Sequence, residues 1–230
     1  MPKRFLIIWA SATVLWQSCT VYRMTITPPP PHIKRIEGYA SLSMKDTQGT
    51  ARSKFSFLFQ LPHQGRIDVT NVLGRTLYRI VIREERAFLV IPSKKAYWRA
   101  KEEEIFERFL GFSMNMGEIV SLLSGKWEDQ RGFYQEERWR EGWILEKDAR
   151  GRVWRGYRGD LKFEVTAYFK NTSVARSLVF QHPLSEGRLK ILGLNYNKPL
   201  KERAFSLDFL ETCRQKTWQE IEKLLGKKKK

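Results

Sequence analysis

Apolar and polar side chains alternate along most of the chain from residue 36 onward, which is the pattern of β-strands with one apolar face. Short turns at 62–65, 73–76 and 84–86 separate the early strands and favour antiparallel neighbours. The clearest alternation lies at 40–44, 55–61, 67–69, 78–82, 161–167, 175–180, 189–194 and 205–209, and an apolar run at 87–91 continues the early series. Strands resume after the middle of the chain at about Trp143.

Helical spacing interrupts the strands in the middle of the chain and returns at its end. Three consecutive glutamates precede an apolar stripe that stops at Gly111. Asn115 and Glu118 form a capping-box pattern before a second stripe, which stops at Gly125. A third helix is expected from about Thr212, with its apolar residues on one side.

The pattern predicts a mainly β fold with α (α+β): a single curved antiparallel sheet forming a half-open β-barrel, with a helical lid and a C-terminal helix. Strands with one apolar face must be covered, because an exposed apolar sheet aggregates. A lid that fills such a sheet incompletely leaves an apolar cavity; alternatively, phenyl rings fill the interior. The residues expected to line the cavity and bind acyl chains are Phe55, Phe57, Phe59, Ile67, Val69, Ile80, Ile82, Phe109, Ile119 and Leu123. A one-residue error in register would invert this assignment.

The first nineteen residues have the pattern of a bacterial export signal that ends in a lipidated cysteine. A cationic start precedes an apolar run of about 12 residues, whereas a membrane-spanning helix needs roughly 20. Cys19 follows the small Ser18 and is expected to carry the lipid; an ordinary cleaved signal with an incidental thiol is the alternative. Cys19 and Cys213 are the only cysteines, so one disulfide is the other use of the pair.

Four segments are therefore expected. They are a lipoprotein signal peptide at 1–18, a lipidated tether with a proline-rich spacer at 19–35, the sheet domain at 36–211, and an amphipathic helix with a basic tail at 212–230.

The net charge of +17 would ordinarily suggest nucleic acid as the partner. An exported chain meets anionic lipid and acidic proteins instead, so a membrane surface or a protein partner is expected and nucleic acid is not. The stretch 139–158 mixes tryptophans with arginines and could stack on bases. Arginines that cover the edges of aromatic rings on half-exposed strands explain it equally well.

Enzymatic chemistry is not expected. His32, His63 and His182 are scattered, with no metal-ligand spacing, and no serine sits in a Gly-x-Ser-x-Gly turn. The chain also lacks a phosphate-binding Gly-x-x-x-x-Gly-Lys run. Neither catalytic residues nor a metal site nor a cofactor is therefore predicted.

Several segments resemble the outer-membrane lipoprotein receptor family LolB. They are the run Arg66–Thr76, the opening strand with Gly38-Tyr39-Ala40, the helix end Leu122-Leu123-Ser124-Gly125, and the late strand Gly187–Ile191. Together with Cys19, the likeness spans most of the chain after the leader. The chain departs from the family at Val72, where proline is more common, and in its C-terminal helix and basic tail.

The resemblance implies a half-open barrel with a helical lid, which accepts lipoproteins from the periplasmic carrier LolA and places them in the outer membrane. The loop Asn71, Val72, Leu73 and Gly74 would insert into the membrane through Leu73; a leucine folded back onto the core is the alternative. The implied partners are a LolA-like carrier, lipoprotein cargo and outer-membrane lipid. Covalent lipid (palmitate) on Cys19 and the acyl chains of the cargo are the only implied ligands. A non-transporting envelope lipoprotein that uses the same fold as a docking module is the second possibility.

Overall fold

The computed structural model describes residues 26–46, 49–71, 73–84, 86–127, 142–200 and 202–225. The predicted signal peptide, Cys19, Val72, Trp139 and the basic tail lie outside the described residues.

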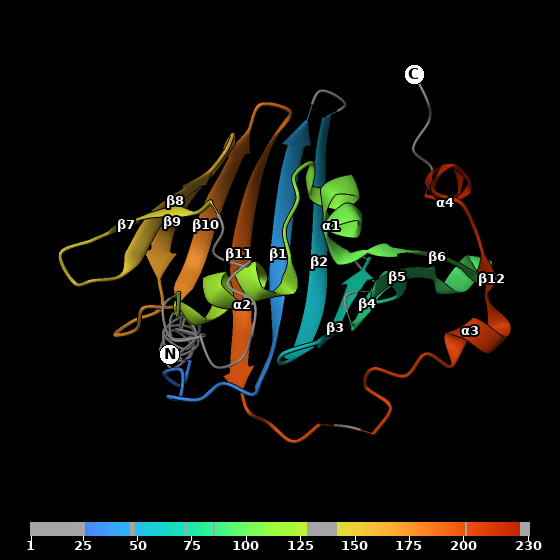
Figure 1. Ribbon diagram of the computed structural model, residues 1–230, viewed down its shortest axis with the longest axis horizontal. Coiled ribbons are helices and arrows are strands. Elements are labelled where there is room, and N and C mark those ends of the chain that lie inside the picture. The colour runs from blue at the N-terminus through green and yellow to red at the C-terminus, as the bar shows by residue number, and fades with distance from the viewer. Residues whose placement is uncertain are drawn as a thin grey trace, which may run out of the picture.

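The described residues form one sheet of twelve strands that curves around two helices (Figure 1). The strands are β1 (Arg35–Asp46), β2 (Gly49–Gln60), β3 (Gln64–Thr70), β4 (Thr76–Arg83), β5 (Arg86–Ile91), β6 (Ala96–Lys101), β7 (Ile144–Lys147), β8 (Val153–Arg158), β9 (Leu161–Tyr168), β10 (Ala175–His182), β11 (Ser185–Tyr196) and β12 (Arg214–Gln215). Their order across the sheet is β12-β6-β5-β4-β3-β2-β1-β11-β10-β9-β8-β7.

Two antiparallel meanders, β1 to β6 and β7 to β11, share this sheet. They join along the antiparallel pair of β1 and β11, which are both twelve residues long. The curved, mainly antiparallel sheet that the alternation predicts is therefore confirmed. Only β12 pairs in parallel, with β6 at one edge of the described sheet.

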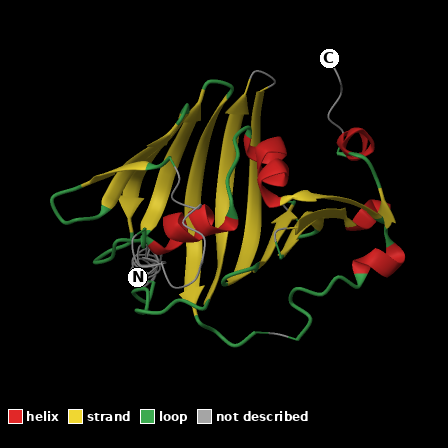
Figure 2. Ribbon diagram, in the orientation of Figure 1, coloured by secondary structure: helices red, strands yellow, loops and turns green. Residues whose placement is uncertain are grey.

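Two helices lie against the inner face of the sheet, as Figure 2 shows in red. Helix α1 (Glu102–Leu110) ends at Gly111, whose φ of 79° is left-handed. Helix α2 (Met116–Ser124) begins with the predicted capping box of Asn115 and Glu118 and ends at Gly125 with φ of 67°. Both helix ends use a glycine because other residues rarely adopt this conformation. A short 3-10 turn, η2 (Pro92–Lys94), joins β5 to β6.

The C-terminal segment differs from the sequence prediction. The alternation at 205–209 predicts a strand, but this region forms a turn and the short helix α3 (Phe209–Thr212). The last helix, α4 (Trp218–Leu224), begins six residues after the predicted Thr212, because β12 comes between. Phe209 packs edge-on against Phe88 and Tyr97, with ring centroids 5.7 Å from each. Burial on an existing sheet therefore replaces strand pairing here.

The C-terminal segment passes from the outer to the inner face at the edge of the sheet, where its strand β12 pairs with β6. On the outer face α3 covers β5, which is apolar on both sides (Ala87–Ile91 are all buried). After β12, α4 reaches the inner face, where Trp218 contacts Trp98 at 4.9 Å between ring centroids. Because it crosses an exposed edge, this segment also protects β6 from pairing with other chains.

Candidate functional site: a lidded apolar cavity

A cavity of about 120 Å³ lies between the inner face of the sheet and the two lid helices. Its walls come from β1 to β4, β10 and β11, and its roof comes from α1, α2 and the segment between them. Among the described residues that line it, none is charged, and only Ser53 and Tyr78 carry a polar oxygen. The cavity is therefore suited to an apolar ligand and offers little to a polar one.

Nine of the ten residues that the sequence assigns to the cavity line it. The sheet supplies Phe55, Phe57, Phe59, Ile67, Val69 and Ile80, and the lid supplies Phe109, Ile119 and Leu123. Ile82 does not, although it is buried on the same face. Together with Phe59 and Met116 it closes over Gly65, farther along β4 than the cavity extends.

Sequence reasoning missed other residues that line the same space. They are Ala40, Leu42, Ser53, Tyr78, Phe106, Leu110, Met114, Leu122, Phe180 and Leu189. Most follow the same two-residue or helical spacing as the predicted set, so this spacing could have identified them. Phe180 and Leu189 could not be placed without knowing that β11 lies beside β1.

Aromatic rings occupy much of the interior. Phe57 stacks on Phe59 with ring centroids 5.8 Å apart, and Tyr78 lies 4.9 Å from Phe109. Pockets that hold a drug-sized ligand measure roughly 300–1,000 Å³, so this cavity is smaller than that range. Both alternatives from the sequence are thus realised in part, because the rings fill the interior but leave an apolar space.

Burial keeps the nearby tyrosines neutral. It raises the pKa of Tyr78 to about 12 and also raises the pKa of Tyr196, whose hydroxyl donates to the Leu123 carbonyl at 3.4 Å. Both tyrosines therefore stay neutral to a higher pH than an exposed tyrosine would.

Glu118 fastens α2 to the far half of the sheet. Its side chain is 1% exposed, accepts a hydrogen bond from Trp143 Nε1 at 2.6 Å, and pairs with the Arg158 guanidinium. Arg158 also donates to the Ser113 carbonyl, just before the helix. Burial raises the pKa of Glu118, while Trp143 and Arg158 oppose the shift. The capping box predicts the backbone role of Glu118; nothing in the sequence indicates this second role.

Helix α4 fastens α1 in a similar way. The Trp218 ring lies 6.2 Å from Phe109 in an edge-on contact, and the Arg108 guanidinium lies 5.3 Å from the Trp218 ring centroid. Ser185 Oγ donates to the Leu110 carbonyl at 3.2 Å, which ties the end of α1 to the β10–β11 turn. The lid is thus held by side chains from three separate parts of the chain.

The turn between β3 and β4 exposes the leucine singled out from the sequence. Leu73 is 76% exposed, so it does not fold back onto the core. Asn71 Oδ1 accepts hydrogen bonds from the amides of Leu73 and Arg75, both at 3.0 Å, and Gly74 has a left-handed φ of 75°. The turn is therefore internally braced while its largest side chain faces solvent.

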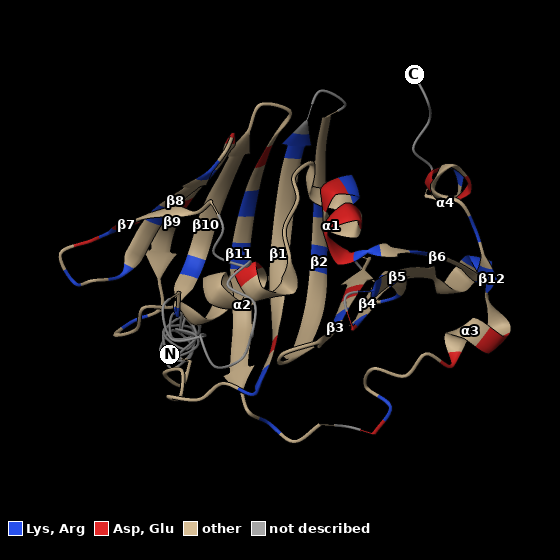
Figure 3. Cartoon of the chain, viewed as in Figure 1, with Lys and Arg blue, Asp and Glu red and all other residues tan. Residues whose placement is uncertain are grey.

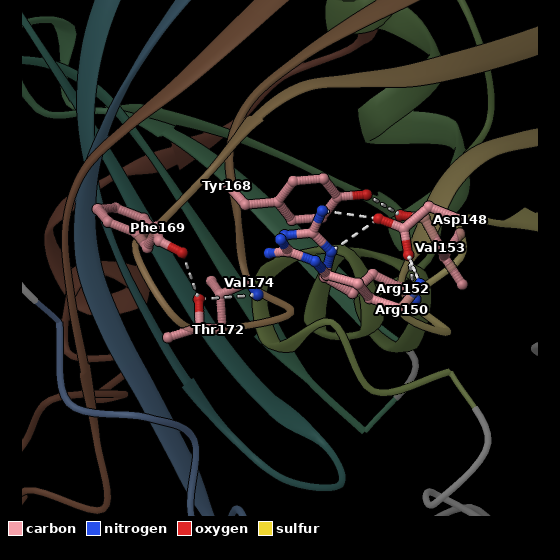
Figure 4. Close-up of polar contacts among 8 residues, drawn as sticks. All are labelled: Asp148, Arg150, Arg152, Val153, Tyr168, Phe169, Thr172 and Val174. Carbon is pink, nitrogen blue, oxygen red and sulfur yellow. Dashed lines mark hydrogen bonds and ion pairs between the residues drawn. The ribbon is translucent and has the colours of Figure 1, made fainter.

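Three arginines of the stretch 139–158 contact protein groups. Arg152 pairs with Asp148, and its guanidinium lies 3.9 Å from the Tyr168 ring centroid (Figure 4). The hydrogen bond from Arg152 holds the pKa of Asp148 below its usual value. Arg155 lies over Trp154, and Arg158 lies over Trp143. For these three residues, the interpretation that arginines cover aromatic rings is confirmed.

Within the described ranges, no group of His, Cys, Asp and Glu side chains is arranged to hold a metal ion. Helices long and apolar enough to cross a membrane are also absent from the described part of the chain.

Neither a protein-family model nor a curated protein matches the sequence. Solved structures with some likeness include a DUF1329 family protein from Desulfovibrio piger, with 9% identity, a TM-score of 0.49, and coverage of 76% of this chain and 91% of that one. A LolA superfamily protein from Nitrosomonas europaea has 7% identity and a TM-score of 0.49, over 79% of this chain and 93% of its own. A domain from Vibrio parahaemolyticus, named for outer membrane lipoprotein sorting, has 10% identity and a TM-score of 0.47, over 77% and 91%. Likenesses at this level assign neither a family nor a function to this chain.

Proposed function

We propose that this protein is a lipid-anchored receptor at the periplasmic face of the outer membrane, which accepts lipoproteins from a LolA-like carrier and inserts them into that membrane. The observation that carries the proposal is the uncharged apolar cavity beneath two helices. The exposed Leu73 on a braced turn and the sequence resemblance to the LolB family support it.

The energetics explain why such a cavity is useful. Transfer of an acyl chain from an apolar phase to water costs about 0.8 kcal/mol of free energy per methylene, so a sixteen-carbon chain faces a barrier on the order of 12 kcal/mol. A protein that shelters the chain removes most of this barrier. Each tenfold higher affinity of the acceptor over the donor for the cargo corresponds to about 1.4 kcal/mol, so differences in affinity can drive transfer and a nucleotide-driven step is unnecessary.

The small volume of the cavity implies that the lid moves when cargo enters. Helix α1 is joined to α2 by the short segment 111–115, and its last residues, Phe109 and Leu110, line the cavity. Displacing α1 would join the cavity to solvent without breaking any strand pair. Because α2 is held by the buried Glu118, α1 is the part of the lid that opens in this proposal.

A transfer assay tests this function. The chain is mixed with an acylated lipoprotein bound to a LolA-like carrier, and the amount of lipoprotein transferred from the carrier to the chain is measured. Ser53→Phe should block the cavity, because Ser53 lines it. Ser56→Phe is the matched control, because Ser56 is a half-buried serine of the same strand that lines a different, outer-face pocket. Transfer to wild type and Ser56→Phe but not to Ser53→Phe is expected; equal transfer to all three would contradict the proposal.

The small cavity also favours a second candidate, a docking lipoprotein that carries no cargo. Such a protein would co-purify with a stoichiometric protein partner, and Ser53→Phe would leave that association unchanged. A receptor should instead retain lipid after purification.

A further inference from the structure

A basic groove crosses the outer face of the sheet, largely opposite the cavity, although two of its lining residues, Leu42 and Ser53, line the cavity as well. It has a volume of about 1040 Å³ and runs over β11, β1 and β2 to the β3–β4 turn. Five basic side chains line it, and Glu186 is the one acidic residue among the described residues that do so. The basic residues are Lys45, Arg52, Lys54, Arg188 and Lys190. Figure 3 shows basic positions on these three strands.

Strand register arranges four of these cations as two facing pairs. Ser41 of β1 lies opposite Lys54 on one side and Lys190 on the other. Two residues along, Ser43 lies in the same way between Arg52 and Arg188. The small serines form a floor, and the cations on either side are about 10 Å apart, since each strand spacing is about 4.8 Å. Long basic side chains can converge on an anion across that distance.

These cations have no acidic partner within the described part of the chain. All five are exposed, and none forms an ion pair with a described carboxylate. The neighbouring strands β3 and β4 differ in this respect, because Arg66 and Arg79 both pair with Asp68, at 2.6 Å and 2.5 Å. Unpaired like charges repel one another, so these side chains do not stabilise the free protein. An anionic partner would relieve the repulsion.

Exposed apolar side chains border the same groove. Leu77 lines it and is 47% exposed, while Asn71 and Gly74, which flank the exposed Leu73, also line it. Thr70 Oγ1 donates to the Lys54 carbonyl at 3.4 Å, so the turn and the basic pairs share one rim. Cations beside protruding leucines suit a bilayer surface, where phosphates lie above acyl chains.

We infer that this groove docks the protein on anionic phospholipid, with lipid phosphates between the paired cations and Leu73 and Leu77 at the acyl boundary. The inference rests on the proposed function for its setting, and it names the membrane chemistry that the receptor would recognise. It places the docking surface on the face of the sheet that does not carry the lid, so α1 stays free to move.

Vesicle binding tests the inference. The chain is made from Thr20 onward throughout, so that neither the predicted signal peptide nor the predicted lipid on Cys19 anchors it. Vesicles containing phosphatidylglycerol are compared with phosphatidylcholine vesicles by flotation. Each basic residue near an anionic surface contributes a factor of about five, so Lys54→Gln with Arg188→Gln should weaken binding about 25-fold at low salt.

The matched control removes Arg86 and Lys101, an exposed, facing basic pair of β5 and β6 outside the groove. Arg86→Gln with Lys101→Gln should change binding less than threefold. Equal losses in both double variants, or no preference for anionic vesicles, would overturn the inference. Release of the protein from vesicles by millimolar inorganic phosphate at constant ionic strength would also overturn it, because that result would indicate a site for soluble phosphate. Binding to an acidic protein that depends on the groove, without binding to vesicles, would overturn it as well. Retained fatty-acid binding in the same samples would leave the proposed function standing if docking failed.

Discussion

Leu73 is a large apolar side chain that buries little of its surface when the protein folds. It is 76% exposed, and the hydrogen bonds of Asn71 hold its turn in place without using the side chain. A residue in this position contributes little to the free energy of unfolding, so its value lies in what it contacts outside the protein.

Leu73→Ser is expected to separate acceptance of cargo from its insertion. Burying a leucine in an apolar phase is worth about 1.5–3 kcal/mol, so insertion of lipoprotein into vesicles should fall about tenfold or more. Transfer from the carrier and the urea midpoint should stay unchanged. Ile144→Ser, at a 70% exposed residue on the far edge strand β7, is the control and should insert cargo normally. Equal insertion defects in the two variants would argue against a specific role for the turn.

Glu118 gives the stability of the protein a defined pH dependence. The unfolded chain releases this proton near the ordinary value of 4.5, whereas burial raises the pKa in the folded state. The folded state therefore holds more protons over that interval, and the contribution of Glu118 to stability falls as the pH rises.

Urea unfolding at several pH values checks this sign. The free energy of unfolding of wild type, relative to Glu118→Gln, should decline from about pH 4.5 upward and level off once the folded carboxyl group is ionised. Glu104→Gln, at an exposed position of α1, controls for the removal of a carboxylate. A difference that grows with pH would mean that the ion pair with Arg158 outweighs burial.

At the scale of elements, the lid is fastened unequally. Helix α2 has a buried charge, a capping box and eight buried residues, whereas only Ile105 and Phe106 are buried in α1. Much of the outer support of α1 comes from Trp218 in the C-terminal segment, which the sequence resemblance to the LolB family does not include. The C-terminal segment is therefore positioned to set how readily α1 opens.

Trp218→Ala should loosen α1. The half-buried ring contacts Trp98 and Phe109, so its loss should lower the free energy of unfolding by about 2–3 kcal/mol. Amide hydrogens of α1 should exchange faster, and fatty acid should enter the cavity sooner. Trp154→Ala is the comparison, because Trp154 is a half-buried tryptophan of β8 that stacks on Arg155. Exchange in α1 that is identical in the two variants would show that Trp218 does not hold the lid.

The sequence predicts elements well wherever local periodicity decides the structure. The strands from β1 to β5 and both lid helices follow from apolar spacing and capping residues, because each has one face to bury. The C-terminal segment could not be predicted in this way, since Phe209 and Trp218 take their places from partners more than a hundred residues away. The continuous apolar run at 87–91 was the one local sign that both faces of β5 are covered.

The site shows the same division. Six of the nine predicted cavity residues followed from period-two spacing and three from helical spacing, whereas the size of the cavity depends on how the phenyl rings pack in three dimensions. The pairing of Glu118 with Trp143 and Arg158 joins residues 25 and 40 positions apart, and no local pattern encodes it.

At the scale of the whole molecule, the two faces of one sheet carry different chemistry. The inner face is apolar and lidded, whereas the outer face is basic around β1 and carries apolar side chains beneath the C-terminal segment and at the border of the groove. In the proposed receptor, cargo is held on one face while the membrane is met on the other. The first of these tasks depends on the cavity accepting an acyl chain.

Binding of a fluorescent sixteen-carbon fatty acid to the purified chain tests most directly whether the cavity accepts an acyl chain. We expect saturable binding by wild type and by Ser56→Phe, with affinity at least tenfold weaker in Ser53→Phe, because Ser53 faces the cavity and Ser56 does not. Absence of binding to wild type, or equal affinity in the two phenylalanine variants, would contradict the proposed role of the cavity.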